Sequence, residues 1–529
     1  MSKNQFKTGA LLSYVSLILS NVISIVYTPI MLRLIGQSEY GIYNIAISLV
    51  GYLGIMDLGF GNAIIKYTSK YIAEEDKEKE YNLNGMFILI YSVLGLITLI
   101  LGMFLIGNLN TLYYDILSNN DMYILKILLT LMIVNTALSF PMGVFNSIIL
   151  AYERFIFPKT LAIITKIITP ILVLITLLAG YGSIGMVIVT VVLNILSNII
   201  SMIYCFKELR IEIKFYSLDF DVFKEILNFS LYVFIGMIVD KIYWSTDQLI
   251  LASVSGPTMV AIYSISSNFN TYYRSFSTAI SSMFLPRITK MVSKGNSKNE
   301  ISEIFIKIGR IQYIIISFIL CGFILVGEQF ISIWAGEEYK SAYLMTLFVM
   351  IPLTIPMIQT IGLSILQARN LHKFRAKVYF VIAILNLFAS IPLSKYMGGN
   401  GCALATGGSL IIGHGIIMNI YYYKKVEIDI PLFWKNIIQM SKGVLISIVL
   451  TLGLCIVIPS YIANNIIIKA LIFTIIFIVL IWNISMNEYE KDLFMGQFNK
   501  IVYLIKRKYK YASEIERKIN EKGNDSCIY

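Results

Sequence analysis

The sequence is poor in charge and in the side chains that carry most bond-making chemistry. Only 14% of its 529 residues are charged, and it contains two histidines and five cysteines. Because a soluble domain typically carries about 25% charged residues, the composition argues against an ordinary soluble fold. The cysteines are scattered without paired spacing, which predicts neither a disulfide framework nor a metal site. No Walker, HExxH or nucleophile-elbow pattern is present, so an enzyme is not indicated.

What the sequence has instead is apolar residues in long blocks. Hydrophobic residues make up 57% of the chain, and the mean hydropathy is +0.75. The blocks are about 20 residues long, the length needed to cross ~30 Å of hydrocarbon as a helix. The first block has no small-residue cleavage site after it and is interpreted as a retained helix. These features predict an all-α polytopic membrane protein with about fourteen transmembrane helices.

Lysine and arginine are concentrated in alternate breaks between the apolar blocks. Cytoplasmic loops of membrane proteins carry this excess, so both termini are expected on the cytoplasmic side of the plasma membrane. The formal net charge of +12 is then a consequence of topology, and a nucleic-acid partner is not needed to explain it. The basic C-terminal tail has an amphipathic pattern that favours contact with anionic membrane lipids.

A weak internal repeat divides the chain into two halves. The segment ILAYERF at 149–155 aligns with ILQARNL at 365–371, and at the same offset Gly185 falls on Gly401 after a tight turn in both copies. The pattern predicts two six-helix pseudo-repeats in the same orientation, followed by two C-terminal helices. The predicted parts are an N-terminal lobe at 1–206, an interfacial cytoplasmic linker at 207–225, a C-terminal lobe at 226–423, two additional helices at 424–486, and a basic cytoplasmic tail at 487–529.

Polar residues gather in two of the predicted spans. In the span at 260–285, Tyr263, Asn270 and Arg274 share one helical stripe that cannot face lipid, with Arg274 near the midplane. In the span at 226–251, Asp240 and Lys241 lie at similar depth. A charge within the membrane is by default a functional-site hypothesis, although these three charges can also neutralise one another as a structural cluster. Asparagine and hydroxyl groups can serve merely as contacts between helices.

Cations and aromatic rings together favour one kind of ligand. Lysine and arginine suit phosphate oxygens, and aromatic faces suit sugar rings. The cavity expected between these spans therefore suits an anionic phospho-sugar lipid headgroup. The predicted substrate-binding residues are Arg274, Lys241, Asn270, Tyr273, Trp244 and Tyr263.

Two segments resemble a known family. LIGQSEYGIYNIAISLVGYLGIMDLGFGNAIIKYTSKY, at 34–71, resembles the opening of the polysaccharide-biosynthesis transporters, the oligosaccharide flippases of the multidrug/oligosaccharidyl-lipid/polysaccharide superfamily. STDQLILASVSGPTMVAIYSISSNF, at 245–269, is similar to the counterpart in their second repeat. The resemblance implies a secondary-type transporter rather than an enzyme. It would move an undecaprenyl-diphosphate-linked oligosaccharide across the plasma membrane by alternating access, for surface polysaccharide biosynthesis.

The resemblance also implies partners and an energy source. The partners are the lipid-linked oligosaccharide, membrane lipids, and polysaccharide polymerase or assembly proteins. No cofactor is expected other than a coupling Na⁺ or H⁺. Arg33 and Lys66 would have to assist the cavity cations, which are few for a diphosphate.

Asp57 lies in the otherwise apolar stretch GYLGIMDLGFGNAIIKY. An anionic side chain is a poor direct ligand for a diphosphate, so three roles stay open: an ion pair in an inward gate, a site for the coupling cation, and a structural contact between helices. The adjacent glycines allow close helix approach or a local break. The residues predicted for gating or ion coupling are Asp57, Asp240, Asp247, Arg33 and Lys66.

Three alternatives remain at this stage. A peptidoglycan-precursor flippase shares the expected helix plan. An ion-coupled drug exporter of the same superfamily is disfavoured by the extra helix pair and the DLGFGNA pattern. A membrane-embedded sugar or acyl transferase belongs to a different class, and it would need an external acidic or histidine-centred site that the sequence does not offer.

Overall fold

The computed structural model describes residues 3–113, 116–215, 220–293, 297–369, 371–457 and 465–496. Within these ranges every regular element is a helix, and no strand occurs. The predicted all-α class is therefore confirmed.

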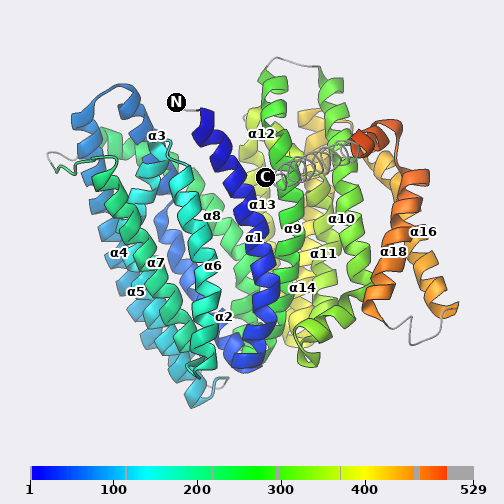
Figure 1. The fold of residues 1–529 in the computed structure, drawn as a ribbon, viewed down its shortest axis with the longest axis horizontal. Helices are drawn as coiled ribbons and strands as arrows, with labels where there is room; N and C mark the ends of the chain where they lie inside the picture. Colours follow the sequence, from blue (N-terminus) through cyan, green and yellow to red (C-terminus); the bar gives the residue numbers. More distant parts are fainter. Residues whose placement is uncertain are drawn as a thin grey trace, which may run out of the picture. The chain divides into compact units, whose positions relative to one another are not determined.

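The helices up to residue 293 contain the charged and aromatic residues predicted for the cavity. In chain order they are α1 (Lys3–Ile35), α2 (Gln37–Leu53), the 3₁₀ segment η1 (Gly54–Asp57), α3 (Phe60–Ala73), α4 (Lys77–Tyr113), α5 (Asn119–Ala151), α6 (Ile156–Leu178), α7 (Gly182–Lys207), α8 (Phe220–Val254) and α9 (Gly256–Ser293). Figure 1 shows α4, α5, α7 and α6 side by side, in agreement with the packing of α5 against both α4 and α7.

The second half of the chain is also helical but more often interrupted. Its elements are α10 (Lys298–Trp334), η2 (Glu337–Tyr339), α11 (Ala342–Ile358), α12 (Ile361–Ala368), α13 (His372–Met397), α14 (Gly399–Leu410), the π-helical η3 (Ile411–Met418), α15 (Asn419–Tyr421), the π-helical η4 (Tyr422–Val426), α16 (Ile430–Val457), α18 (Ile466–Leu480) and the π-helical η5 (Ile481–Ser485).

The chain forms two compact units. The first comprises Met1–Ile301 and Gly327–Ile428, and the second comprises Ser302–Val326 and Asp429–Tyr529. This division does not separate the two predicted six-helix lobes, and their boundaries stay a prediction. Most of the predicted tail, from residue 497 onward, and residues 216–219 of the predicted linker lie outside the described residues.

Helix length and composition agree with a polytopic membrane protein. Among the described residues, twelve helical segments are long and apolar enough to cross a membrane. A thirteenth is α11 with α12, if these two helices, which meet at a 45° bend, form one span. The 38-residue α9 is also long enough to cross, but its polar stripe makes it less apolar than the others. The structure thus offers twelve or thirteen apolar candidate spans where about fourteen were predicted, and α9 occupies the position of the predicted polar span at 260–285.

The helical segment Gln37–Ala73, which corresponds to the second predicted span, is interrupted in its middle. Between η1 and α3 the backbone turns left-handed at Leu58 (φ 53°) and Gly59 (φ 74°). Glycine adopts this conformation without a Cβ clash, whereas leucine is strained in it. Asp57 is the last residue of η1. The local break that the neighbouring glycines allow is therefore present.

A buried cluster supports this break from one side. Phe60 of α3, Phe87 of α4 and Val144 of α5 belong to it and are at most 1% exposed. Because these three helices share one apolar core, the interrupted span has a firm neighbour on the side of α4 and α5.

The second unit is held by an apolar cluster and a buried ion pair. Phe318 of α10 stacks on Phe473 of α18 with ring centroids 5.5 Å apart. Arg310 Nε donates to Glu490 Oε1 at 2.6 Å, and its Nη2 donates to the carbonyl oxygen of Ser485 at 3.0 Å. Figure 1 shows α16 and α18 as neighbours, and they pack against each other.

Candidate functional site

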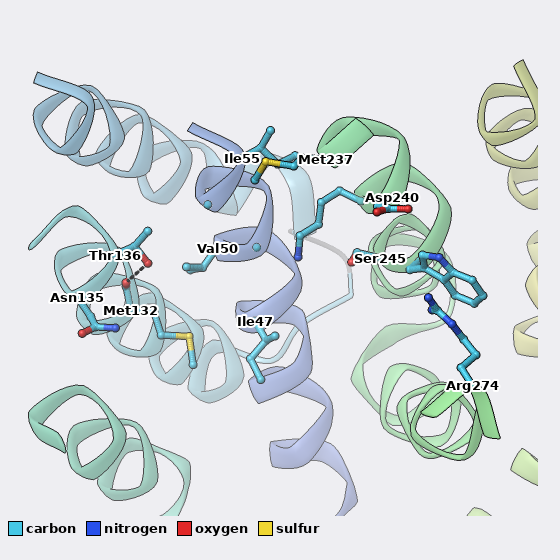
Figure 2. A pocket seen from close by; sticks show the side chains of 14 residues that line it. Ile47, Val50, Ile55, Met132, Asn135, Thr136, Met237, Asp240, Ser245 and Arg274 are labelled. Atoms are coloured by element: carbon cyan, nitrogen blue, oxygen red, sulfur yellow. Dashed lines mark hydrogen bonds between the residues drawn. The ribbon is translucent and has the colours of Figure 1, made fainter. Parts of the chain in front are cut away.

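A cavity of about 690 Å³ lies in the first unit between α2, α5, α8 and α9. Its wall is mainly apolar, and its polar groups come from α5, α8 and α9. Figure 2 shows Asp240 and Arg274 on one side and Asn135 and Thr136 of α5 on the other, with α2 between them. The lining residues are Ile47, Val50, Gly51, Gly54, Ile55, Met132, Asn135, Thr136, Met237, Asp240, Lys241, Trp244, Ser245 and Arg274. An apolar wall with a few charged groups at one side suits an amphiphilic ligand.

Arg274 is positioned by Trp244. Its guanidinium carbon lies 4.1 Å from the centre of the Trp244 ring, which is a cation–π contact. Trp244 is itself packed edge-on against Tyr243, with ring centroids 4.9 Å apart. The hydroxyl of Tyr243 donates to the carbonyl oxygen of Thr406 at 3.1 Å, so α14 fixes the aromatic pair. Stacking leaves the edge of the guanidinium, where its N–H groups lie, free to bind ligand oxygens.

Lys241 reaches the cavity beside α2. A Cβ atom at Gly51 would collide with Lys241 Nζ, so the glycine makes room for the ammonium group. The Tyr52 hydroxyl donates to the main-chain oxygen of Lys241 at 3.3 Å and also bonds the Thr246 hydroxyl. These contacts bind α2 to α8 at the depth of the charged residues.

A second, smaller cavity of about 130 Å³ adjoins the first. The two share Asp240, Trp244 and Arg274. The remaining walls of the smaller cavity are Tyr243, Leu353, Pro356, Met357, Gln359, Thr360, Leu363, Arg375, Tyr379, Leu410, His414 and Tyr422. Arg375 Nη2 donates a hydrogen bond to the Tyr379 hydroxyl at 3.0 Å. The same hydroxyl is hydrogen-bonded to His414 Nε2, 2.5 Å away.

Asp247 is enclosed by hydroxyl groups. It is 4% exposed, and its carboxylate accepts hydrogen bonds from Tyr263 of α9 at 2.6 Å, Ser390 of α13 at 2.9 Å and Thr406 of α14 at 2.7 Å. Asn386 Nδ2 donates to the Thr406 hydroxyl at 3.3 Å. Three donors compensate for the burial of an anion that has no ion-pair partner in the described part of the chain. The cluster is also an all-oxygen set, the kind that hard cations prefer.

Three of the predicted substrate-binding residues do not line either cavity. The Tyr263 hydroxyl donates its hydrogen bond to Asp247. Tyr273 is fully buried, and its hydroxyl shares a 2.7 Å hydrogen bond with Thr354 of α11. Asn270 is 4% exposed and donates to a carbonyl oxygen of its own helix. The predicted stripe is real, but much of it faces neighbouring helices, because α9 is covered by α2, α8, α11 and α12.

The residues predicted for gating are dispersed. Asp57 accepts a 2.7 Å hydrogen bond from the Tyr91 hydroxyl of α4. Arg33 is exposed, and its Nη2 donates to the carbonyl oxygen of Ile333 at 3.2 Å. Lys66 lies 4.8 Å from the centre of the Tyr67 ring. Among the gating residues, Asp240 is the one that reaches both cavities.

Sequence reasoning missed the residues that complete these sites. Arg375 lies in a basic break between two apolar blocks, and His414 is a single histidine in an apolar segment, where it packs edge-on against Tyr379. Asn386 and Ser390 lie in an otherwise apolar span. Their spacing of four residues, which places both on one helix face, is the signal that could have found them.

The helices and cavities together define a multi-pass membrane transporter. The chain belongs to the polysaccharide biosynthesis protein family, whose model matches residues 6–292. A putative O-antigen transporter of Shigella flexneri is 23% identical over 380 residues, which cover 66% of this chain and 84% of that protein. A putative O-antigen transporter of Shigella dysenteriae is 23% identical over 175 residues, and the chain spans 42% of its length.

Solved structures agree on the fold. The lipid II flippase MurJ in an inward closed conformation superimposes with a TM-score of 0.70, at 18% identity, over 93% of this chain and 99% of that one. A multidrug resistance MATE family transporter of the MOP superfamily, inward-facing, gives a TM-score of 0.58 at 14% identity, over 76% of this chain and 99% of that one. At these identities the likeness concerns the fold alone.

Proposed function

We propose that this protein is a flippase that translocates a polyprenyl-diphosphate-linked oligosaccharide, with undecaprenyl as the carrier, across the plasma membrane for surface polysaccharide biosynthesis. Family membership and the O-antigen transporter relatives support the cargo class. It acts as a secondary-type transporter rather than an enzyme, with both termini in the cytoplasm. Polymerase or assembly proteins would receive the cargo.

The observation that carries the proposal is the composition of the larger cavity. Two cations, Arg274 and Lys241, and the ring of Trp244 lie on one side of a mainly apolar chamber of about 690 Å³. Charges at this depth in a membrane are costly unless a cavity or a ligand compensates them. An anionic phospho-sugar headgroup supplies that compensation, because phosphate oxygens bind the cations and a sugar ring stacks on the indole.

Alternating access requires helices that bend. The break at Asp57–Gly59 in the second span and the 45° bend between α11 and α12 are two such places. Both lie in helices that contribute to the cavities, so bending there would change their openings. This geometry supports transport by rearrangement of helices around a central site.

A coupling cation, Na⁺ or H⁺, is the proposed energy source. Asp247 with Asn386, Ser390 and Thr406 would hold it, because these side chains present oxygen atoms to one buried point. The smaller proton would instead neutralise the carboxylate. Either ion would relieve the cost of a buried anion, and its release would restore that cost.

The test is depletion of the protein followed by analysis of membrane lipids. The proposal predicts that a complete undecaprenyl-diphosphate oligosaccharide accumulates in the inner leaflet, measured by accessibility to a membrane-impermeant glycan label. Accumulation of lipid II instead would identify a peptidoglycan-precursor flippase. Unchanged glycan lipids with altered dye efflux would identify a drug exporter, and an incomplete glycan would identify a transferase.

A further inference from the structure

The smaller cavity, at 130 Å³, is large enough for a phosphoryl group but too small for an oligosaccharide. It adjoins the larger cavity, and Asp240, Trp244 and Arg274 line both. Because Arg274 lines both cavities, a ligand that binds Arg274 in the larger cavity lies next to the smaller one.

Two arginines that line the smaller cavity, Arg274 and Arg375, have N–H groups without protein acceptors among the described residues. Each arginine has five N–H groups. Arg274 stacks on Trp244, and Arg375 lies with its guanidinium carbon 4.4 Å from the centre of the Tyr379 ring. Among the described residues Arg375 bonds only Tyr379, and no acceptor bonds the Arg274 side chain. Two guanidinium groups thus face one cavity with most of their donors unused.

The charge of the cavity is positive. Asp240 is the one acidic residue in its lining, and it lies within electrostatic range of both Arg274 and Arg375. One carboxylate cannot neutralise two guanidinium groups, and neither arginine forms an ion pair in the part of the chain that the structure describes. The first turn of α13, which holds Arg375, contains no acidic residue, although helix N-termini favour anions.

Irregular backbone converges on the same place. Gln359 and Thr360 line the cavity at the break between α11 and α12, and His414 lies in the π-helical η3. Such irregularities at membrane depth are tolerated where they line a cavity, and π-helical turns are frequent at functional sites. The Gln359 side chain is 3% exposed, and its amide oxygen has no hydrogen-bond partner among the described residues. A ligand hydroxyl or an ordered water can satisfy a buried acceptor of this kind.

We propose that the smaller cavity is a phosphoryl-binding subsite in which Arg375, together with Arg274, binds the phosphate oxygens of the ligand. Arg375 then adds a third cation to Arg274 and Lys241 of the larger cavity, which alone are few for a diphosphate. Gln359 would accept a hydrogen bond from a ligand hydroxyl or an ordered water. Tyr379 and His414 are positioning residues, because they hold the Arg375 guanidinium through a chain of hydrogen bonds. The inference rests on the proposed function for the identity of the ligand, which is a polyprenyl diphosphate.

The test measures equilibrium binding of radiolabelled farnesyl diphosphate to the purified full-length protein in nanodiscs. Arg375→Gln is expected to weaken this binding at least about tenfold, because it removes a charge-assisted bidentate contact. Lys377→Gln is the matched control, since Lys377 is exposed on the same helix and does not line the cavity. Tyr379→Phe should give a smaller loss. Farnesol, which lacks the phosphates, should bind weakly and equally to all four proteins.

Competition with inorganic pyrophosphate distinguishes the two sources of the phosphoryl group. Weak competition indicates a lipid diphosphate, and competition as strong as that of farnesyl diphosphate indicates a soluble anion in the same subsite. Where Arg375→Gln purifies poorly, Arg375→Lys keeps the charge and should still lose affinity several-fold, because lysine cannot bind bidentately.

Equal binding by wild type and Arg375→Gln overturns the subsite and leaves the flippase proposal standing. Absence of binding in the wild type also overturns the subsite. The flippase proposal is then decided separately, by the lipid that accumulates on depletion.

Discussion

The hydroxyl of Tyr91 on α4 donates a hydrogen bond of 2.7 Å to Oδ1 of Asp57 at the end of η1. The bond links α4 to the carboxylate that directly precedes the backbone break at Leu58 and Gly59. Asp57 forms no ion pair among the described residues, so the structure supplies a partner for a contact between helices and none for a charged gate. The gate and ion-coupling roles of Asp57 stay predictions.

Tyr91→Phe should destabilise the protein by about 1–3 kcal/mol, because it removes the donor to a half-buried carboxylate. Thermal unfolding in detergent measures the effect. Tyr339→Phe is the control, since the buried Tyr339 hydroxyl has no partner among the described residues and its loss should be nearly neutral. Equal shifts in the two variants would show that the Asp57 bond contributes nothing.

Arg274→Gln should reduce surface polysaccharide at least about tenfold in a complementation assay, because a charge-assisted contact to the cargo is lost. Charge reversal in Arg274→Glu should abolish it. Lys290→Gln, near the end of the same helix and exposed, should have no effect. Intact polysaccharide in Arg274→Glu, with protein levels unchanged, would contradict the assignment of Arg274 to the cargo site.

Sodium should stabilise the wild-type protein if Asp247 binds it, by about 2.7 kcal/mol at a concentration of 100 Kd. Asp247→Asn should abolish this stabilisation, which is measured as the shift in Tm between sodium and choline salts at constant pH. Asp492→Asn, at an exposed carboxylate, should respond as the wild type does. A wild type that responds to pH but not to sodium would indicate a proton, and one that responds to neither would refute the coupling site.

Glu490→Gln should cost about 3–5 kcal/mol in the free energy of unfolding. The reason is that Arg310 and Glu490 are both buried, with side chains 8% and 1% exposed, and a guanidinium without its counter-ion is left behind. Glu303→Gln removes an exposed pair with Lys307 on the same helix, and it should change stability by about 1 kcal/mol or less. Comparable losses in the two variants would mean that burial does not strengthen the pair.

Gly41→Ala and Gly107→Ala should change stability in opposite directions. A Cβ atom at Gly41 of α2 would collide with the main chain of Pro257 at the start of α9, which predicts a loss of about 1–3 kcal/mol. A Cβ at Gly107 of α4 meets nothing within 4 Å, and alanine there should stabilise the helix by about 0.5–1 kcal/mol. Thermal unfolding of the two variants measures both changes in stability. A Gly41→Ala protein as stable as the wild type would show that α2 and α9 can separate at little cost.

Much of the architecture could be predicted because it depends on local patterns, namely the length of the apolar blocks and the helical spacing of polar residues. The apolar blocks predicted a helical membrane protein with many spans, since each block is long enough to cross the hydrocarbon. The polar stripe of α9 followed from the helical spacing of its residues. Lys241, Trp244 and Arg274 line one cavity, and their role in binding the cargo stays a prediction.

The partners of those residues were decided by the tertiary structure alone. Arg375 shares a cavity with Arg274, and Asp247 is enclosed by hydroxyl groups from α9, α13 and α14, although nothing in the local pattern links these positions. In a membrane, lipid and protein interior are equally apolar, so hydrophobicity shows that a helix spans but not which neighbour its polar face meets. The sequence by itself determined a helical membrane protein with charged residues inside two of its long helices. The packing of its helices determined which of those charges meet at one site.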